Sequence, residues 1–233
     1  CIVAIGFTII YNTTGIINFA QGEFLMLGGM TAVSLHRHLP LPLAIAGAVV
    51  VTMLAGALIE VLFIRWLNRP SVLRMIMITI GVSIVVREVA LHVWDEKSHA
   101  LPYFTGDAVS AFTLGGAKIS ILGLAFAVPL LLAAGLALVL FLALYLLIER
   151  TEFGLALQAT SEDRDAARLV GIRPQRMFAV AWGLGAALVA IAGAILVNFF
   201  SVYPQVGLQF TVLAYAIVAL GGFGSILGTL LAA

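Results

Sequence analysis

The sequence predicts an all-α membrane protein, a bundle of about eight transmembrane or partly discontinuous helices. Of its 233 residues, 63% are hydrophobic and 10% charged, whereas a soluble domain carries roughly 25% charged residues. Several apolar runs reach the length of about 20 residues that an α-helix needs to cross a bilayer. The ten-residue alternation typical of a membrane β-barrel is absent.

The expected spans differ in length, and the difference separates whole helices from broken ones. The first two and the last two are too short to cross alone at about 1.5 Å per residue. A polar stretch, 18–23, interrupts the first pair, and a glycine-rich stretch, 221–225, interrupts the last. Interrupted pairs of this kind are typical of discontinuous helices that line a pathway. The spans lie at about 1–16, 23–35, 42–64, 75–94, 120–148, 178–200, 209–221 and 223–233.

Composition excludes several classes of function. A net charge of +1 gives no electrostatic case for a nucleic-acid partner. The lone cysteine, Cys1, excludes an intrachain disulfide framework and a cysteine-based metal site, and no metal site is expected. Residues 115–118, GGAK, lack the first glycine and the terminal Ser or Thr of a phosphate loop, so ATP is not bound by that route. Both ends fall inside apolar runs, and we expect them to be truncated.

Arginines predict the orientation of a single membrane domain, 1–233. They gather in the loops 65–74 and 149–177, which two spans separate, so both loops share one side. The positive-inside rule makes that side cytoplasmic. Loop 95–119 is then external, and its prolines and glycines predict a short structured cap or hairpin.

Loop 149–177 encodes a short helix of its own, at about 161–170. Thr160 and Asp163 fit a capping box at its start. Gly171 fits a left-handed cap at its end, and Pro174 prevents continuation. A docking surface for another protein and a solvated connecting helix are equally compatible with these features. Small residues that would allow close approach are Ala159, Ala166 and Ala167.

Three motifs carry a resemblance to a known family. Residues 165–171, DAARLVG, resemble the EAA-x-x-x-G coupling motif of ABC-importer permeases, with Asp165 in place of glutamate. Residues 11–28, YNTTGIINFAQGEFLMLG, are similar to the Y-G-x-x-G-x-I-N-F-A-H-G segment of permeases for branched-chain amino acids. Residues 219–228, ALGGFGSILG, are similar to their L-G-G-x-G-S-x-x-G. The order of the three motifs is also the family's order.

The resemblance implies a bacterial inner-membrane permease that does no chemistry and binds no cofactor itself. A separate ABC ATP-binding subunit, carrying ATP and Mg²⁺, would dock on loop 149–177. A second permease, identical or homologous, would complete the pathway within the membrane lipid, and an external solute-binding protein would deliver the substrate. The expected coupling residues are Gly154, Ala159, Asp163, Asp165, Ala166, Ala167 and Gly171.

Departures from the family pattern leave the substrate open. Asn12 replaces the usual glycine, Gln21 replaces a common histidine, and Leu213 stands where many relatives carry lysine. Branched-chain amino acids are the first expectation, and other amino acids, urea and short amides are the alternatives. A stand-alone channel or an ion-coupled transporter is an alternative of another class. An ion-coupled transporter usually needs an ion site of acidic residues within its spans, and Glu23 and Glu88 offer little for such a site.

Polar and glycine residues in the two breaks are candidates for the translocation path. Burying a polar group at membrane depth is costly unless it is paired with another group or faces water. The structural alternative is that Asn18 and Gln21 tie the broken backbone together and Glu23 anchors at the interface. Gly224 and Gly228 have the small-xxx-small spacing of close helix packing. The path candidates are Asn18, Gln21, Glu23, Gly221, Gly222, Gly224 and Ser225.

Two charged residues lie within the span 75–94. Arg87 and Glu88 are adjacent, so their side chains point about 100° apart and do not pair with each other. We expect each to find a partner on another helix or to snorkel, rather than to contact substrate. Ser225 as the nucleophile of a membrane protease is the third class considered, and it lacks a histidine base within a span.

Overall fold

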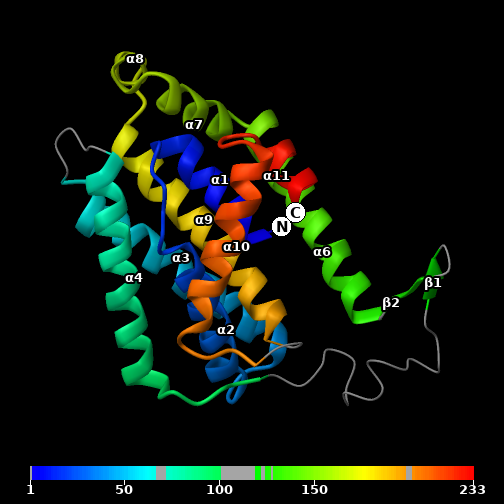
Figure 1. Ribbon diagram of the computed structural model, residues 1–233. Helices are drawn as coiled ribbons and strands as arrows, with labels where there is room; N and C mark the ends of the chain where they lie inside the picture. Colours follow the sequence, from blue (N-terminus) through cyan, green and yellow to red (C-terminus); the bar gives the residue numbers. More distant parts are fainter. Residues whose placement is uncertain (1, 67–71, 101–118, 122–123, 127, 198–200) are drawn as a thin grey trace.

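The computed structural model describes residues 2–66, 72–100, 119–121, 124–126, 128–197 and 201–233, which form a helical bundle with one small hairpin (Figure 1). The predicted order of apolar segments is confirmed, except that the span expected at 120–148 begins with a β-hairpin and is helical only from Val128. The elements are α1 (Ile2–Thr14), α2 (Gln21–His36), α3 (Leu41–Ile59), the π-helical turn η1 (Glu60–Ile64), α4 (Val72–Trp94), β1 (Ile119–Ile121), β2 (Leu124–Phe126), α6 (Val128–Arg150), α7 (Glu152–Glu162), α8 (Arg164–Leu169), α9 (Pro174–Leu196), α10 (Val206–Gly221) and α11 (Ile226–Ala232).

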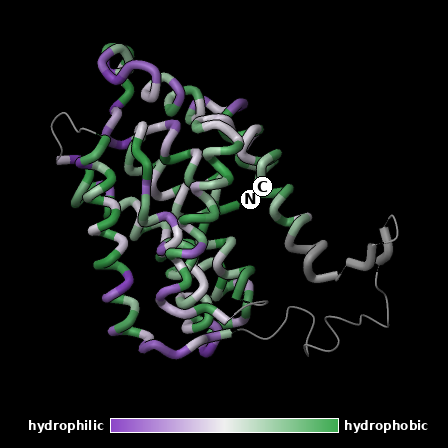
Figure 2. Tube along the Cα trace, in the orientation of Figure 1, coloured by the Kyte–Doolittle hydropathy of each residue, from purple (hydrophilic) through white to green (hydrophobic). Residues whose placement is uncertain are grey.

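Length and composition qualify three of the described helices to cross a membrane: α3 continued by η1, α4 and α9. Two further pairs pass the same test together across a bend, 74° between α6 and α7 and 115° between α10 and α11, which raises the number to as many as five. These helices support the predicted multi-pass membrane protein. Figure 2 shows the apolar residues along the helix bodies and the polar ones gathered mainly at the two ends of the bundle.

Helix α9 is the centre of the bundle, because 67% of its apolar window is buried against 22% for α4. It packs against α1, α2 and α3. A Cβ atom added at Gly193 would lie 2.0 Å from the Leu25 carbonyl oxygen of α2, and one at Gly28 would lie 2.4 Å from the Ala190 Cα. Glycine at these positions lets the two backbones touch, which is how membrane helices gain packing contacts.

Both predicted helix breaks are present. The first separates α1 from α2, and the second separates α10 from α11. Gly222 and Gly224 have φ angles of +88° and +90° in the second break, which glycine adopts without a steric penalty. The small-xxx-small spacing of Gly224 and Gly228 does not lie on one helix, because Gly224 falls in the break before α11, but the close packing expected there is present at Gly228. A Cβ atom on Gly228 would meet the Gly221 carbonyl oxygen at 1.9 Å, because the chain turns back between them.

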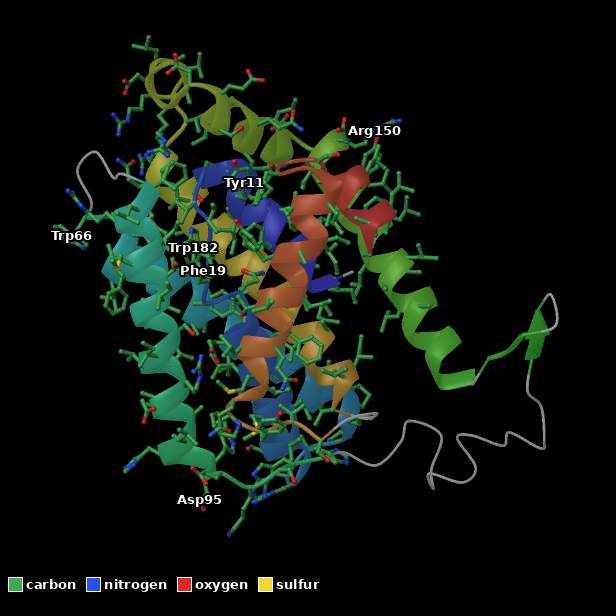
Figure 3. The ribbon with its side chains drawn as sticks, in the orientation of Figure 1. Tyr11, Phe19, Trp66, Asp95, Arg150 and Trp182 are labelled. Atoms are coloured by element: carbon green, nitrogen blue, oxygen red, sulfur yellow. The ribbon has the colours of Figure 1, made fainter. Side chains whose placement is uncertain are left out.

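The two arginine-rich loops lie at one end of the bundle, as predicted. Arg65 Nη2 donates to the Gln175 carbonyl oxygen at 3.4 Å and so joins them. Figure 1 shows α7 and α8 at this end, and Figure 3 shows Asp95 at the other. Of the predicted external cap, 101–118 lie outside the described residues. β1 and β2 pair antiparallel just beyond it, and His99 pairs with Val202.

Candidate functional site

The long loop contains two helices rather than the single one predicted at 161–170. α7 begins after Thr151, whose hydroxyl accepts a hydrogen bond from the Gly154 amide at 3.1 Å. α7 and α8 are separated by Asp163, whose extended backbone (φ −146°, ψ 110°) ends one helix and starts the other. A bent pair of helices results, lying across the end of the bundle (Figure 1).

The predicted capping box is wrong in its first member. Thr160 lies inside α7, and its hydroxyl donates to the Ala156 carbonyl oxygen at 2.7 Å. Asp163 is itself the N-cap of α8, and Oδ1 accepts from the amides of Asp165 (2.8 Å) and Ala166 (3.0 Å). These two bonds hold the pKa of Asp163 below its ordinary value, because they favour the charged form.

The end of α8 follows the prediction. Gly171 has φ +87°, the left-handed conformation of a glycine cap, and the Ile172 amide donates to the Ala167 carbonyl oxygen at 3.0 Å. Pro174 opens α9 at its first position, where a missing amide proton costs nothing. Among the expected coupling residues, Gly154 and Ala167 are buried and Ala159 is half-buried, whereas Asp163, Asp165, Ala166 and Gly171 are exposed.

Polar residues of the first break are tied to one another. The side chain of Asn18 donates to Gln21 Oε1 at 3.2 Å, and its Oδ1 accepts from the Ala20 amide at 2.9 Å. Asn18 and Gln21 are both fully buried. The Gly22 amide donates to Thr211 Oγ1 of α10 at 2.9 Å. This geometry matches the structural alternative for Asn18 and fixes the start of α2 against α10.

Glu23 is a buried partner of Arg87. Arg87 Nη2 lies 2.8 Å from Glu23 Oε1, and Ser83 Oγ donates to the same oxygen at 2.8 Å. The expectation of an interhelical partner for Arg87 is therefore confirmed. The alternative of an interfacial anchor for Glu23 is wrong, because its residue exposure is 0%. Glu88, by contrast, is exposed on α4.

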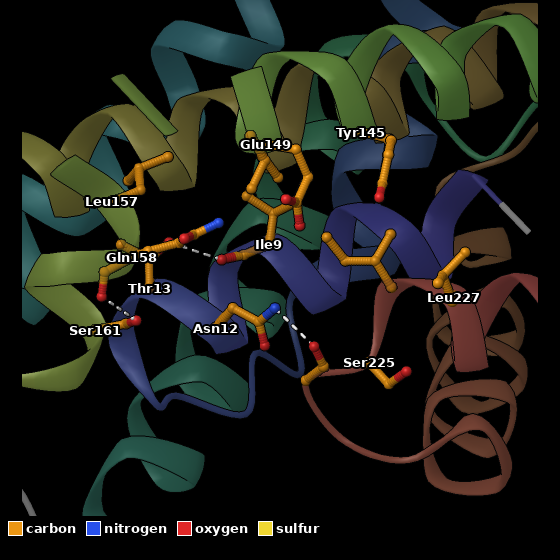
Figure 4. Close-up of a pocket in the computed structure, with 13 residues that line it drawn as sticks. Ile9, Asn12, Thr13, Tyr145, Glu149, Leu157, Gln158, Ser161, Ser225 and Leu227 are labelled. Carbon is orange, nitrogen blue, oxygen red and sulfur yellow. Dashed lines mark hydrogen bonds between the residues drawn. The ribbon is translucent and has the colours of Figure 1, made fainter. Parts of the chain in front are cut away.

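A cavity of about 460 Å³ opens under α7, between α1, α6 and α11 (Figure 4). It brings parts of two of the three motifs together, Asn12 from the first and Gly224 and Ser225 from the last, and α7 adds Gln158 and Ser161. Asn12 Nδ2 donates to the Gly224 carbonyl oxygen at 2.8 Å. The lining residues are Ile9, Asn12, Thr13, Tyr145, Ile148, Glu149, Leu157, Gln158, Ser161, Gly224, Ser225, Ile226 and Leu227.

The structure divides the predicted path residues into three groups. Gly224 and Ser225 line the cavity, whereas Asn18, Gln21 and Glu23 lie at the start of α2. Gly221 and Gly222 shape the bend between α10 and α11. Ser225 Oγ accepts from the Gly228 amide at 2.9 Å and caps α11, so its hydroxyl has a structural use.

A cluster of aromatic rings between the two breaks was missed by the sequence reasoning. Tyr215 stacks on Phe19 at 5.8 Å and meets Phe223 edge-on at 5.6 Å between ring centroids. Phe223 also lies 5.3 Å from Tyr11, and Phe7 contacts three members of the cluster. The i,i+4 spacing of Phe7 and Tyr11 on one helix face was the only local signal.

The helices, the broken spans and the capped helical loop at one end define a polytopic helical membrane protein. The chain belongs to the family described as the permease component of the branched-chain amino acid transport system, whose model matches residues 1–233.

Comparison with individual proteins of similar sequence supports the same family. The chain is 32% identical to the high-affinity branched-chain amino acid transport system permease protein BraD of Pseudomonas aeruginosa, over 99% of this chain and 77% of BraD. It is 29% identical to LivH of Escherichia coli, with the same coverage. It is 26% identical to the autoinducer 2 import system permease protein LsrC of Salmonella paratyphi B, over 64% of LsrC. No solved structure matches the chain.

Proposed function

We propose that this chain is a permease subunit of an ATP-driven importer in a bacterial inner membrane. Its substrate would be a branched-chain amino acid, moved by alternating access. The observation that carries the proposal is the placement of the DAARLVG motif on an exposed, capped helix. α8 and α7 together rest on α1 and α9, so a force on the loop would reach the spans directly.

The partners follow from this role. ABC ATP-binding subunits would dock on α7 and α8 and hold the ATP and Mg²⁺, while this chain would hold no cofactor and perform no chemistry. Closure of the ATPases would push the helices and change which side of the membrane is open. A second permease subunit would complete the path. The external solute-binding protein would dock at the end of the bundle that carries Asp95.

The substrate class rests on the relatives. BraD and LivH are named for branched-chain amino acid transport, and LsrC for autoinducer 2 import at lower identity. Urea, short amides and other amino acids are the remaining alternatives. An ion-coupled carrier would use an acidic residue within a span as its ion site. Glu23 is engaged with Arg87 instead, which favours the ATP-driven mechanism.

Affinity purification of the full-length chain from its host, in mild detergent, tests the proposal. We expect an ATP-binding subunit to accompany the chain. Labelled leucine uptake by proteoliposomes containing the purified complex and the solute-binding protein should then require ATP. Absence of an ATPase, under conditions that preserve a known ABC complex, would overturn the proposal and direct the search to ion flux.

A further inference from the structure

Arg164, the first residue of α8, reaches out of the loop to the end of the first helix. Its Nη2 donates to the Thr14 carbonyl oxygen at 3.0 Å, across 150 positions of sequence. Its guanidinium carbon also lies 4.7 Å from the centre of the Phe178 ring on α9. One side chain thus joins α8 to α1 and α9.

The Thr14 carbonyl is one of the last four of α1, which have no partner within their own helix. The negative end of the helix dipole also lies there, so a guanidinium is favoured on both counts. The contact with the ring of Phe178 adds a cation–π interaction. Arg164 is therefore held in one place by three kinds of attraction, although the residue as a whole is exposed.

Little else attaches α8 to the spans. Ala167 is its one buried residue. Arg168, the other arginine of this helix, pairs with Asp165 of the same helix at 3.0 Å, and both side chains are more than half exposed. α7 packs on α1 directly, whereas α8 is bonded to α1 through the side chain of Arg164.

The backbone that follows Thr14 leads to the polar residues of the first break. The Ile16 amide donates to Thr14 Oγ1 at 3.3 Å, and the Ile17 carbonyl oxygen accepts from Thr79 of α4 at 3.4 Å. Residues 15–20 then enter α2, where Glu23 pairs with Arg87. A displacement of Thr14 would thus act on α2 and α4 through a short segment.

We propose that Arg164 is the positioning residue that transmits movement of α8 to the break between α1 and α2. This inference rests on the proposed function. It adds that coupling depends on one hydrogen bond from the loop to the Thr14 carbonyl, in addition to the fit between α8 and the ATPase.

Arg164→Gln tests the inference, with Arg168→Gln as the matched control. Both variants remove one arginine from α8, and only the first removes the bond to Thr14. In proteoliposomes with the whole complex, leucine imported per ATP hydrolysed should fall at least about fivefold for Arg164→Gln, the low end of typical coupling. The ratio should stay at the wild-type value for Arg168→Gln, since weaker docking would lower uptake and hydrolysis together. Equal ratios in the two variants would overturn the inference.

A thiol reporter gives a second readout that does not need the substrate. Cys1 is the only cysteine, so Cys1→Ser combined with Ile17→Cys places one thiol in the segment 15–20. Its rate of modification by a maleimide should change on adding ATP and a transition-state analogue of hydrolysis. The change should vanish with Arg164→Gln and persist with Arg168→Gln. A reporter that never responds, in a complex that does import leucine with ATP, refutes the linkage alone. A complex without any ATPase refutes the proposed function and the linkage with it.

Discussion

Glu23 and Arg87 form an ion pair of 2.8 Å between α2 and α4, and Ser83 donates to the same carboxylate oxygen. The glutamate side chain is 1% exposed and the arginine side chain 21%. Only a few residues of α4 are buried. The pair is therefore a main attachment of α4 to the rest of the bundle, and its loss should separate the two helices.

Arg87→Leu should lower the stability of the protein rather than change its substrate preference. Removing one member of a buried pair leaves the other charge unpaired, which costs roughly 3–5 kcal/mol. We expect a lower midpoint of thermal unfolding in detergent and less assembled complex. Glu88→Leu is the matched control, because the neighbouring side chain is exposed. Normal assembly with altered substrate selectivity would reverse this interpretation.

Gly171 should tolerate asparagine and reject valine. Its φ angle is +87°, and an added Cβ atom would meet nothing within 4 Å, so only the backbone conformation restricts the residue. Asparagine adopts this conformation several-fold more readily than other residues, whereas a β-branched side chain is strained there. Gly171→Val should uncouple ATP hydrolysis from uptake while the spans stay folded, and Gly171→Asn should keep most of the coupling. Normal ATP-driven uptake by the valine variant would remove Gly171 from the coupling residues.

The cap of α8 should weaken in acid. The pKa of Asp163 is lowered from 3.8 by hydrogen bonds from the amides of Ala166 and Asp165. A lowered folded-state pKa means that this contribution is complete above pH 3.8 and is lost as the pH falls through the folded-state value. Amide exchange protection at Asp165 and Ala166 should show that loss. Asp163→Asn, which keeps an acceptor but no charge, should remove the acid dependence and retain partial protection. An unchanged acid dependence in this variant would assign it to another group.

Local patterns were sufficient for the order of the helices and for both breaks. Hydrophobic length, proline and glycine act within a few residues, so spans such as 42–64 and 75–94 were placed within several residues of α3 with η1 and of α4. The loop was harder to predict, because both Thr151 and Asp163 are good N-caps. Reading Thr160 as a cap merged part of α7 with α8.

Contacts between distant segments could not be read from the sequence. The partner of Arg87 lies 64 positions away, and Asn12 meets Gly224 across 212 positions. Both pairings depend on how the helices pack against one another, which no local pattern specifies. The first and the last of the three motifs meet at the cavity under α7, a proximity that their separation in the chain conceals.

Gly228→Ala should distort the bend between α10 and α11. The added Cβ atom would lie 1.9 Å from the Gly221 carbonyl oxygen, and because that atom belongs to the backbone it cannot rotate away. The two helices would have to separate, which moves Ser225 and the wall of the cavity. Gly135→Ala on α6 is the control, since its Cβ atom meets nothing within 4 Å and alanine favours the helix. We expect a lower unfolding temperature in detergent, together with reduced ATP-driven uptake, only for Gly228→Ala. Equal unfolding temperatures for the two variants would show that α11 is free to shift, and would remove the Gly221–Gly228 contact as a constraint on the cavity.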